Sequence, residues 1–292
     1  MSELIKFTEI SESDAVTTYS LDRILWTGAT TACESVIIAE SPAYGRLLFL
    51  DGELQSSSRD EHIYHETLVH PVMASAFNAK VEGIPLRVLV VGGGEGATVR
   101  EVLSWQHVIV DWVDIDGDLV ILCEKYLNWA LGTRQDGRVR FHAEDIRTFL
   151  DRTTPEYYDI VILDLPDPDG DTGYLYSPEF WVDIAAHMVT GGRIVSHVGP
   201  VSPVSTPCLY GPGYDRVRSA SSDSLSFDPT GFYHIGIPSF QGEWGFAGAV
   251  KGGGAFFGFD YGFIQKKVPW IRVADSRQVR EWAEPTRLWR CV

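Results

Sequence analysis

Residues 88 to 103 combine a strand pattern, a glycine cluster and a helical pattern. Val88 to Val91 form an uninterrupted apolar run, which is typical of a strand covered on both faces of a parallel sheet. After Gly92 to Gly96, apolar residues recur at helical spacing from Ala97 to Leu103. The glycines therefore lie between the carboxyl end of a strand and the amino end of a helix. Backbone amides and the helix dipole favour negative or hydrogen-bond-accepting ligand groups there.

The same alternation of apolar runs and helical repeats continues along the chain. Further strands are predicted at 108–113, 139–143, 158–163 and 193–198. A helix from Phe180 to Met188 is expected to be capped by Gly191 and Gly192, and a late hairpin is expected within 232–250. This order predicts an α/β fold with a Rossmann-like, doubly wound and mostly parallel sheet.

The first part of the chain has a different pattern. Residues 18 to 55 alternate as short strands separated by turn formers, which predicts a small β meander. From Asp60 onward the apolar spacing becomes helical, and the helix is expected to link two parts of the chain. We therefore expect an N-terminal β domain with its linking helix over 1–80, and a Rossmann-like catalytic domain over 81–292.

Composition limits the functions that are open to the chain. Its 292 residues, 45% hydrophobic, suffice for a large core. Four cysteines without paired spacing, and no Cys/His cluster of zinc type, predict reduced thiols, a cytoplasmic protein and no metal site. Neither a signal peptide nor an apolar run of ~20 residues is present, so no membrane segment is expected. The formal charge of −16 argues against nucleic acid and is compatible with a cationic substrate.

The glycine turn alone leaves the ligand open. Gly92, Gly94 and Gly96 fit both a dinucleotide pattern and the tighter G-x-G-x-G of S-adenosyl sites, and an ordinary tight turn is the plain alternative. Asp114 ends the next strand about 20 residues further on, where a carboxylate can accept both ribose hydroxyls of either ligand. Glu95 distinguishes them, because it would repel a pyrophosphate and attract the ammonium and sulfonium of an S-adenosyl compound.

Acidic residues follow several predicted strands. Asp114, Asp145 and the group from Asp164 to Asp167 each come at a strand's carboxyl end, although each alone could be a helix cap or a solvated carboxylate. The carboxyl ends of parallel strands share one edge, so these acids should converge on the glycine turn. A site with so many carboxylates favours a ligand with several positive charges.

These motifs resemble, over nearly the whole chain, the polyamine aminopropyltransferases, the spermidine synthase group. The resemblance rests on several ordered motifs together. They are Leu50-Asp-Gly-Glu-Leu-Gln55, Asp60-Glu-His-Ile-Tyr-His-Glu66, Gly92-Gly-Gly-Glu-Gly96 with Val99-Arg-Glu-Val102, Asp114-Ile-Asp116, Glu144-Asp145 and Asp164-Leu-Pro-Asp-Pro168. The sequence looks most similar to the bacterial and thermophile branch, which accepts longer amines or agmatine.

The resemblance implies transfer of an aminopropyl group from decarboxylated S-adenosylmethionine to an amine, with methylthioadenosine as the other product. Glu95 would hold the donor's ammonium and disfavour the carboxylate of ordinary S-adenosylmethionine, and Asp114 would bind the ribose. The remaining residues implied on the donor side contact the adenine, Asp145 and Ile146, or line the sulfonium end, Gln55 and His65.

On the acceptor side the resemblance makes Asp164 the base and lets Tyr64 and Asp167 position the amine. A base is required on chemical grounds too, because an alkyl ammonium with a pKa of ~10 has no lone pair with which to attack. Phe240 and Trp244 would face the amine. Phe240 stands where many diamine-using members carry a tyrosine, so the sequence looks more like members that extend spermidine than like those that use putrescine.

Two other functions stay open at this level. The same scaffold could serve an S-adenosylmethionine-dependent N-methyltransferase or aminocarboxypropyltransferase, although Glu95 opposes a donor that carries a carboxylate. A non-catalytic polyamine-binding protein is the other alternative. The resemblance also suggests a homodimer or homotetramer, with the N-terminal strands as one contact.

Overall fold

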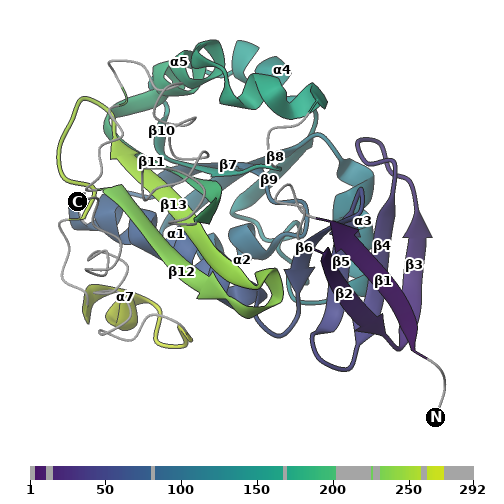
Figure 1. The fold of residues 1–292 in the computed structure, drawn as a ribbon. Helices are drawn as coiled ribbons and strands as arrows, with labels where there is room; N and C mark the ends of the chain where they lie inside the picture. The colour runs from purple at the N-terminus through teal and green to yellow at the C-terminus, as the bar shows by residue number, and fades with distance from the viewer. Residues whose placement is uncertain are drawn as a thin grey trace, which may run out of the picture.

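A seven-stranded sheet forms the centre of the protein (Figure 1). The computed structural model describes residues 4–10, 16–79, 83–166, 170–201, 225, 231–257 and 262–272. In spatial order the strands are β12 (Phe232–Ile237), β13 (Gly242–Val250), β11 (Met188–Val201), β10 (Tyr158–Asp164), β7 (Leu86–Gly92), β8 (Val108–Asp114) and β9 (Val139–Ala143). The five strands from β11 to β9 are parallel, whereas β13 and β12 add antiparallel pairs at one edge.

The sheet is doubly wound, as predicted. The chain passes from β7 outward through β8 to β9, and then returns to the other side of β7 to form β10 and β11. The strand order therefore reverses between β7 and β10, which is where open α/β sheets bind their ligands. Gly92 pairs with Asp164 across this junction, at the carboxyl ends of the two strands.

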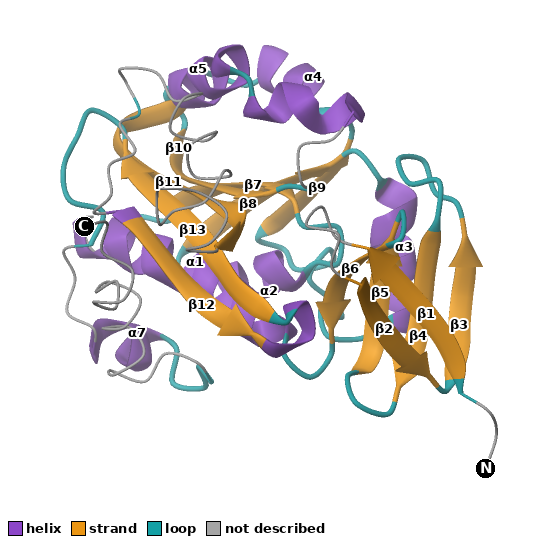
Figure 2. Cartoon of the chain, in the orientation of Figure 1, coloured by secondary structure: helices purple, strands orange, loops and turns teal. Residues whose placement is uncertain are grey.

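Helices cover both faces of the sheet (Figure 2). On one face lie α1 (Glu61–Ala79) and α2 (Ala97–Leu103), whose apolar residues pack with Val88 and Val90 of β7. On the other face α4 (Ile146–Asp151) and α5 (Pro178–His187) pack against Leu89 and Val91. Successive residues of β7 thus enter opposite cores, which explains why its sequence is apolar without alternation.

The N-terminal part forms two small antiparallel sheets. One is the meander of β3 (Arg23–Gly28), β4 (Val36–Ser41), β5 (Gly45–Leu50) and β6 (Glu53–Ser57), and the other pairs β1 (Ile5–Ile10) with β2 (Val16–Leu21). The meander confirms the strand prediction. Helix α3 (Gly117–Tyr126) packs its Leu119 and Cys123 against Val36 and Ile38 of β4. A domain boundary at residue 80 stays a prediction.

Two local expectations were wrong or incomplete. Gly191 and Gly192 do not cap the preceding helix, because α5 ends at His187 and both glycines lie inside β11. Their backbones pair with Lys251 in both directions, so they belong to the sheet. The β1–β2 hairpin was also not predicted in full. The late hairpin is confirmed by β12 and β13, and a short helix, α7 (Gly262–Lys267), follows it.

Candidate active site at the carboxyl edge of the sheet

The glycine turn is shaped around Asp164. Gly92 and Gly93 have positive φ angles of 79° and 71°. A Cβ on Gly92 would overlap the Asp164 carbonyl oxygen, and a Cβ on Gly93 would lie 2.8 Å from Asp164 Oδ2. The Gly93 amide donates to the same carbonyl at 2.9 Å. Side chains at these two positions would displace Asp164, so the turn needs glycine for packing as well as for backbone conformation.

The other end of the turn approaches Asp114. A Cβ on Gly94 would lie 3.3 Å from Asp114 Oδ2, and Gly96 has a φ of 78° at the amino end of α2. The turn therefore runs between the carboxylates of Asp164 and Asp114. The structure brings these two acids to one edge of the sheet, as the strand pattern predicts.

Asp114 is an acid in a poor environment for charge. Its side chain is buried, and Oδ1 accepts one hydrogen bond, from the Asp116 amide at 2.8 Å. The pKa of Asp114 is raised to about 7, chiefly by burial and further by the charges of Asp116 and Asp164, against the opposing effect of that amide. A ligand that donates hydrogen bonds to the Asp114 carboxylate would stabilise its charge, which burial otherwise disfavours.

Asp116 itself is fixed by the N-terminal part of the chain. Its Oδ1 caps α3 by accepting from the Leu119 amide at 2.9 Å. Its Oδ2 accepts from the Thr30 hydroxyl at 2.5 Å and from the Ala32 amide at 3.1 Å. A loop between β3 and β4 thus holds the residue whose amide orients Asp114.

Both oxygens of Asp164 accept hydrogen bonds from hydroxyl groups. Tyr64 of α1 donates to Oδ1 at 2.8 Å, and Thr98 of α2 donates to Oδ2 at 2.6 Å. The carboxylate is therefore oriented from two helices on the same face of the sheet. Each oxygen keeps a second lone pair with which it can accept a proton.

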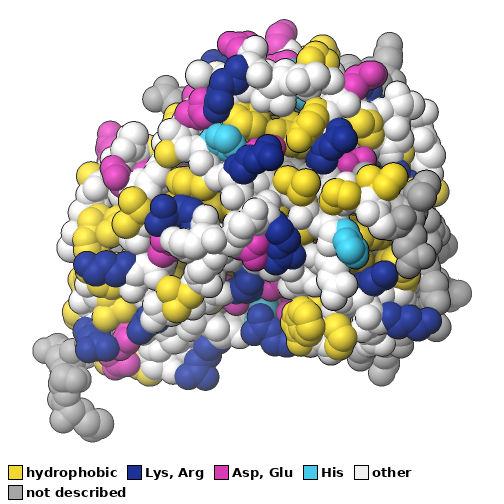
Figure 3. Space-filling model, turned by 180° about the vertical axis from the view of Figure 1, so that it is seen from behind, with side chains coloured by type: hydrophobic (Ala, Val, Ile, Leu, Met, Phe, Trp, Pro, Cys, Tyr) yellow, Lys and Arg dark blue, Asp and Glu magenta, His cyan; other side chains and the backbone are white. Residues whose placement is uncertain are grey.

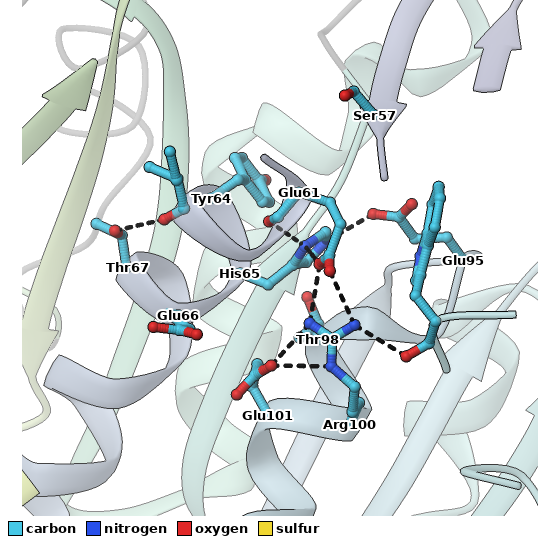
Figure 4. Close-up of polar contacts among 12 residues, drawn as sticks. Ser57, Glu61, Tyr64, His65, Glu66, Thr67, Glu95, Thr98, Arg100 and Glu101 are labelled. Carbon is cyan, nitrogen blue, oxygen red and sulfur yellow. Dashed lines mark hydrogen bonds and ion pairs between the residues drawn. The ribbon is translucent and has the colours of Figure 1, made fainter. Parts of the chain in front are cut away.

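Glu95 lies in the turn and reaches back toward α1 (Figure 4). Its Oε1 is 2.6 Å from Nε2 of His65. Nδ1 of His65 lies 2.7 Å from the Glu61 backbone carbonyl and 3.0 Å from Glu61 Oε2. The other oxygen, Oε2, is buried and has no hydrogen-bond partner among the described residues. Burial of an unpartnered carboxylate oxygen is costly, so Oε2 is a candidate for a cationic ligand group.

Asp145 follows β9 and caps α4. Its Oδ1 accepts from the Arg147 amide at 2.8 Å, and its Oδ2 accepts from Arg147 Nη2 at 2.9 Å and the Tyr174 hydroxyl at 3.1 Å. The pKa of Asp145 is lowered, first by the Arg147 side chain, so this acid stays ionised. Ile146, the first residue of α4, is buried. An adenine at Asp145 would share the carboxylate with Arg147.

Aromatic side chains gather beside Tyr64. Its ring centroid lies 6.4 Å from that of Phe240, which in turn is 4.8 Å from Trp244. Phe240 lies in the short helix η3 (Pro238–Phe240) that joins β12 to β13. Gln55 is half-buried on β6. Asp167 lies outside the described residues.

Sequence reasoning missed several residues at this edge. Thr98 belongs to no motif, and the motifs that contain Glu61 and Arg100 indicate no role for either residue, because these contacts depend on two helices that meet only in the fold. His197 is another residue of this kind. Its Nε2 must donate to the Leu165 carbonyl at 2.5 Å, which leaves Nδ1 buried without a partner in the described part of the chain, beside Trp244 at 6.3 Å between ring centroids. Only the regular spacing of α1 could have placed Glu61 beside His65.

The described residues contain neither a metal site nor a membrane-spanning helix. Among them no group of three or more His, Cys, Asp or Glu side chains could hold a metal ion, and none of their helices is both long and apolar enough to cross a membrane. Cys33 and Cys123 are free thiols, whereas Cys208 and Cys291 lie outside the described residues. On the face opposite to that in Figure 1, basic, acidic and apolar side chains are interspersed (Figure 3).

The fold and its site define a doubly wound α/β protein with a glycine turn and a row of carboxylates at the topological switch point. Residues 61–202 match the family profile described as a spermine/spermidine synthase domain, and residues 5–58 match that of the spermidine synthase tetramerisation domain. The chain belongs to the spermine/spermidine synthase family, as the resemblance predicts, and is a transferase of that class.

Known relatives agree with this assignment. A polyamine aminopropyltransferase of Synechococcus sp. (strain JA-2-3B'a(2-13)) is 38% identical over 225 residues, which cover 76% of this chain and 69% of the relative. Polyamine aminopropyltransferase 2 of Pseudomonas aeruginosa is 36% identical over 247 residues, 82% of this chain and 66% of the relative. The crystal structure of a spermidine synthase in complex with the transition-state analogue AdoDATO has the same fold, with a TM-score of 0.82 and 23% identity over 97% of this chain and 93% of that one. The spermidine synthase of Thermotoga maritima gives a TM-score of 0.81 at 22% identity, over 97% and 92% of the two chains.

Proposed function

We propose that the protein transfers the aminopropyl group of decarboxylated S-adenosylmethionine to a polyamine and releases methylthioadenosine. The observation that carries this proposal is the arrangement of three acids around one glycine turn: Asp164 and Asp114 on either side and Glu95 within it. Two cations side by side, an ammonium and a sulfonium on the donor, match such an anionic edge. The family of the chain supports the same reaction.

On the donor side, the buried Oε2 of Glu95 receives the ammonium of the aminopropyl group. A carboxylate on the donor, as in S-adenosylmethionine, would meet Glu95 and be repelled. Asp114 accepts the two ribose hydroxyls, and Asp145 with the backbone at Ile146 binds the adenine. Gly92, Gly94 and Gly96 let the backbone come close to the ligand.

On the acceptor side, Asp164 removes a proton from the attacking ammonium group. The freed nitrogen lone pair forms a bond to the carbon beside the sulfonium, the carbon–sulfur bond breaks, and sulfur keeps the electron pair as a neutral thioether. The proton stays on Asp164 until it passes to solvent. Tyr64 and Thr98 hold the carboxylate in line, so that orientation supplies much of the rate and no covalent intermediate is needed.

The acceptor is a longer amine, and we favour spermidine. Tyr64 binds Asp164, and the rings of Phe240 and Trp244 follow next to that of Tyr64. Such rings attract ammonium groups and pack against methylene chains. Phe240 offers no hydroxyl for the second amine of a short diamine. A Phe240→Tyr variant should therefore raise kcat/KM for putrescine relative to spermidine, and an unchanged ratio would contradict this part of the proposal.

The central experiment offers the purified protein both donors and a panel of amines, with methylthioadenosine and the alkylated amine measured by mass spectrometry. We expect turnover with the decarboxylated donor and a polyamine. Asp164→Asn should lower kcat by about 10² to 10⁴ while the donor dissociation constant stays within a few-fold. Turnover of S-adenosylmethionine alone would favour methyl or aminocarboxypropyl transfer. Donor-independent polyamine binding without any product would favour a non-catalytic protein.

The assembled protein is proposed to be a homodimer or homotetramer in the cytoplasm. The match to a tetramerisation domain supports an oligomer. Ile10 and Val16 pair across the β1–β2 hairpin and are 65% and 64% exposed, and Ile24 of β3 is 43% exposed, so the N-terminal strands carry apolar surface suited to a contact. Light scattering of the purified protein and of an Ile10→Lys variant tests this, and a monomeric wild type would refute it.

A further inference from the structure

A chain of buried charges leads from Glu95 into the protein (Figure 4). His65 joins Glu95 to Glu61, and Arg100 binds both oxygens of Glu61 at 3.1 Å and 2.8 Å. Arg100 Nη2 then lies 2.7 Å from Glu101 Oε1. The side chains of His65 and Glu61 are each 3% exposed. Positive and negative groups therefore alternate along this path, which is most deeply buried at His65 and Glu61, whereas Arg100 is 23% exposed.

The contacts fix the protonation of His65. Nδ1 of His65 faces the Glu61 backbone carbonyl at 2.7 Å and Glu61 Oε2 at 3.0 Å, and Nε2 faces Glu95 Oε1 at 2.6 Å. Carbonyl and ionised carboxylate oxygens only accept hydrogen bonds, so both ring nitrogens of His65 must carry protons. Burial alone would lower the pKa of His65, but the two carboxylates outweigh it and raise that pKa well above its usual value. Glu61 stays ionised, because His65 and Arg100 lower its pKa to about 2 despite burial.

The buried charges from Glu95 to Glu101 do not balance, because there is one more negative charge than positive. Glu95, Glu61 and Glu101 face one imidazolium and one guanidinium. Two groups next to the chain leave this balance unchanged. His70 Nδ1 accepts from the Trp105 indole at 3.1 Å, so its proton sits on Nε2 toward Glu101 and the ring is neutral. Arg272 lies 3.7 Å from Glu61 Oε1 and also pairs with Glu66 at 3.2 Å, so its positive charge and the negative charge of Glu66 cancel. Glu95 Oε2 is the end of the chain that has no partner among the described residues, and a cation there would restore neutrality.

From this geometry we infer that Glu61 is a positioning residue for donor binding and acts through His65. Glu61 holds the imidazolium on Oε1 of Glu95, which turns the free Oε2 toward the donor's ammonium. The inference rests on the proposed function, since it takes Glu95 as the ammonium acceptor. It also changes the role expected for His65. An imidazolium beside a sulfonium would be repulsive, so His65 serves the donor through Glu95.

The test replaces Glu61 by glutamine, which keeps the shape and removes one of the two carboxylate charges, Glu95 and Glu61, that raise the pKa of His65. We expect Glu61→Gln to weaken the binding of decarboxylated S-adenosylmethionine about tenfold by isothermal titration, as loss of one charge-assisted contact would. With saturating donor, kcat and the KM for the amine should stay within about twofold, because ground-state donor binding is what is lost.

Glu101→Gln is the matched control. Glu101 is equally buried and shares Arg100 with Glu61, but it does not touch His65. Glu101→Gln also removes one negative charge from the cluster, so we expect a small weakening of donor binding, well below that of Glu61→Gln, because His65 keeps its contacts with Glu61 and Glu95. Unchanged donor binding in Glu61→Gln, or equal weakening in both variants, would overturn the inference, since the second result would mean only a loosened Arg100 cluster.

A measurement on the ligand-free wild type does not depend on how the variants fold. Nitrogen-15 NMR of the histidine side chains at pH ~8, above the usual histidine pKa of ~6.5, should show His65 with both ring nitrogens protonated. A neutral His65 at this pH would overturn the inference. Wild-type protein that fails to use the decarboxylated donor would instead refute the proposed function, and the NMR result would be unaffected.

Discussion

Tyr64 donates a hydrogen bond from its phenol to Oδ1 of Asp164 over 2.8 Å. The next residue on the same helix, His65, binds Glu95. One turn of α1 therefore holds the acid proposed as base and the acid proposed to receive the donor. These acids come from different segments, so the position of α1 on the sheet sets the distance between the two reactants.

Replacement of Tyr64 by phenylalanine should slow the chemical step and spare donor binding. Loss of one hydrogen bond to a charged group is worth about 1.5 kcal/mol, which corresponds to about a tenfold lower kcat. Tyr158→Phe is the control, because that buried hydroxyl binds Asp111 at 3.1 Å away from the site. Steady-state kinetics that show the same loss of kcat in both variants would contradict an orienting role for Tyr64.

Gly93→Ala should impair catalysis beyond its effect on stability. The new Cβ would lie 2.8 Å from Asp164 Oδ2 and would force this carboxylate to move. Gly132→Ala is a close control, since Gly132 also has a positive φ, 82°, but a Cβ at that position would meet no atom within 4 Å. Both variants should lose about 1 kcal/mol of unfolding free energy, whereas only Gly93→Ala should lose turnover, by about tenfold or more. Urea unfolding and kinetics on the same preparations distinguish the two effects.

Donor binding should weaken as the pH falls through 7. The ribose hydroxyls donate to Asp114, so binding needs its ionised form, and burial raises the pKa of Asp114 to about 7. The donor dissociation constant should therefore rise about tenfold between pH ~8 and pH ~6. Glu61, with a pKa of about 2, stays ionised throughout this interval. Isothermal titration of Asp114→Asn should show weaker binding without this pH dependence.

Asp114 should also make the unfolding free energy depend on pH, but in the opposite direction: stability should fall as the pH rises, whereas donor binding should strengthen. Asp114 has a raised pKa in the folded protein, so the folded state binds its proton more tightly than the unfolded chain does. Its contribution to stability is complete below the usual aspartate pKa of ~3.9 and is lost as the pH rises through 7. Ligand-free Asp114→Asn should gain stability relative to the wild type between pH ~5 and pH ~8 in urea unfolding. A constant difference would mean that Asp114 is ionised in both states.

Much of the fold could be predicted because its signals are local. The apolar run of β7, the glycines after it and the helical spacing of α2 lie within about 20 residues of one another, and the doubly wound sheet follows from repetition of this unit. The prediction that Gly191 and Gly192 cap a helix was wrong. Glycine after a helix usually marks the end of that helix, but here both glycines pair with Lys251 and lie in β11. The partner strand is distant in sequence and gives no local signal.

The candidate site, too, has some residues that could be predicted from the sequence and others that could not. Acids at strand ends could be brought together by topology alone, and Asp114, Asp145 and Asp164 do share one edge. Contacts between helices could not be predicted. Thr98 reaches Asp164 and Arg100 reaches Glu61 because α2 lies against α1, and neither residue type is unusual at its position. The sequence indicates which strand ends carry chemistry, and packing decides what orients them.

The loop between β3 and β4 should influence donor binding from outside the site. Thr30 donates to Asp116, and the Asp116 amide is the hydrogen-bond donor to Asp114. Thr30→Val removes the hydroxyl while it keeps the shape, so Asp116 should lose one bond and the unfolding free energy should fall by about 1 kcal/mol. With only the Ala32 amide of the loop left to hold it, Asp116 and with it Asp114 should bind the ribose less well, and the donor dissociation constant should rise roughly three- to tenfold.

Two variants make this prediction specific. Thr31→Val removes the neighbouring hydroxyl, which binds the exposed Asp118 at 2.9 Å, and should leave donor binding unchanged. Thr30→Ser restores the hydroxyl and should recover most of the affinity. If Thr30→Val bound the donor as tightly as the wild type, Asp114 would be held by the strand β8 alone. If instead the serine variant failed to recover affinity, the methyl packing of Thr30 would be what matters, because Asp116 would have regained its hydrogen bond without effect.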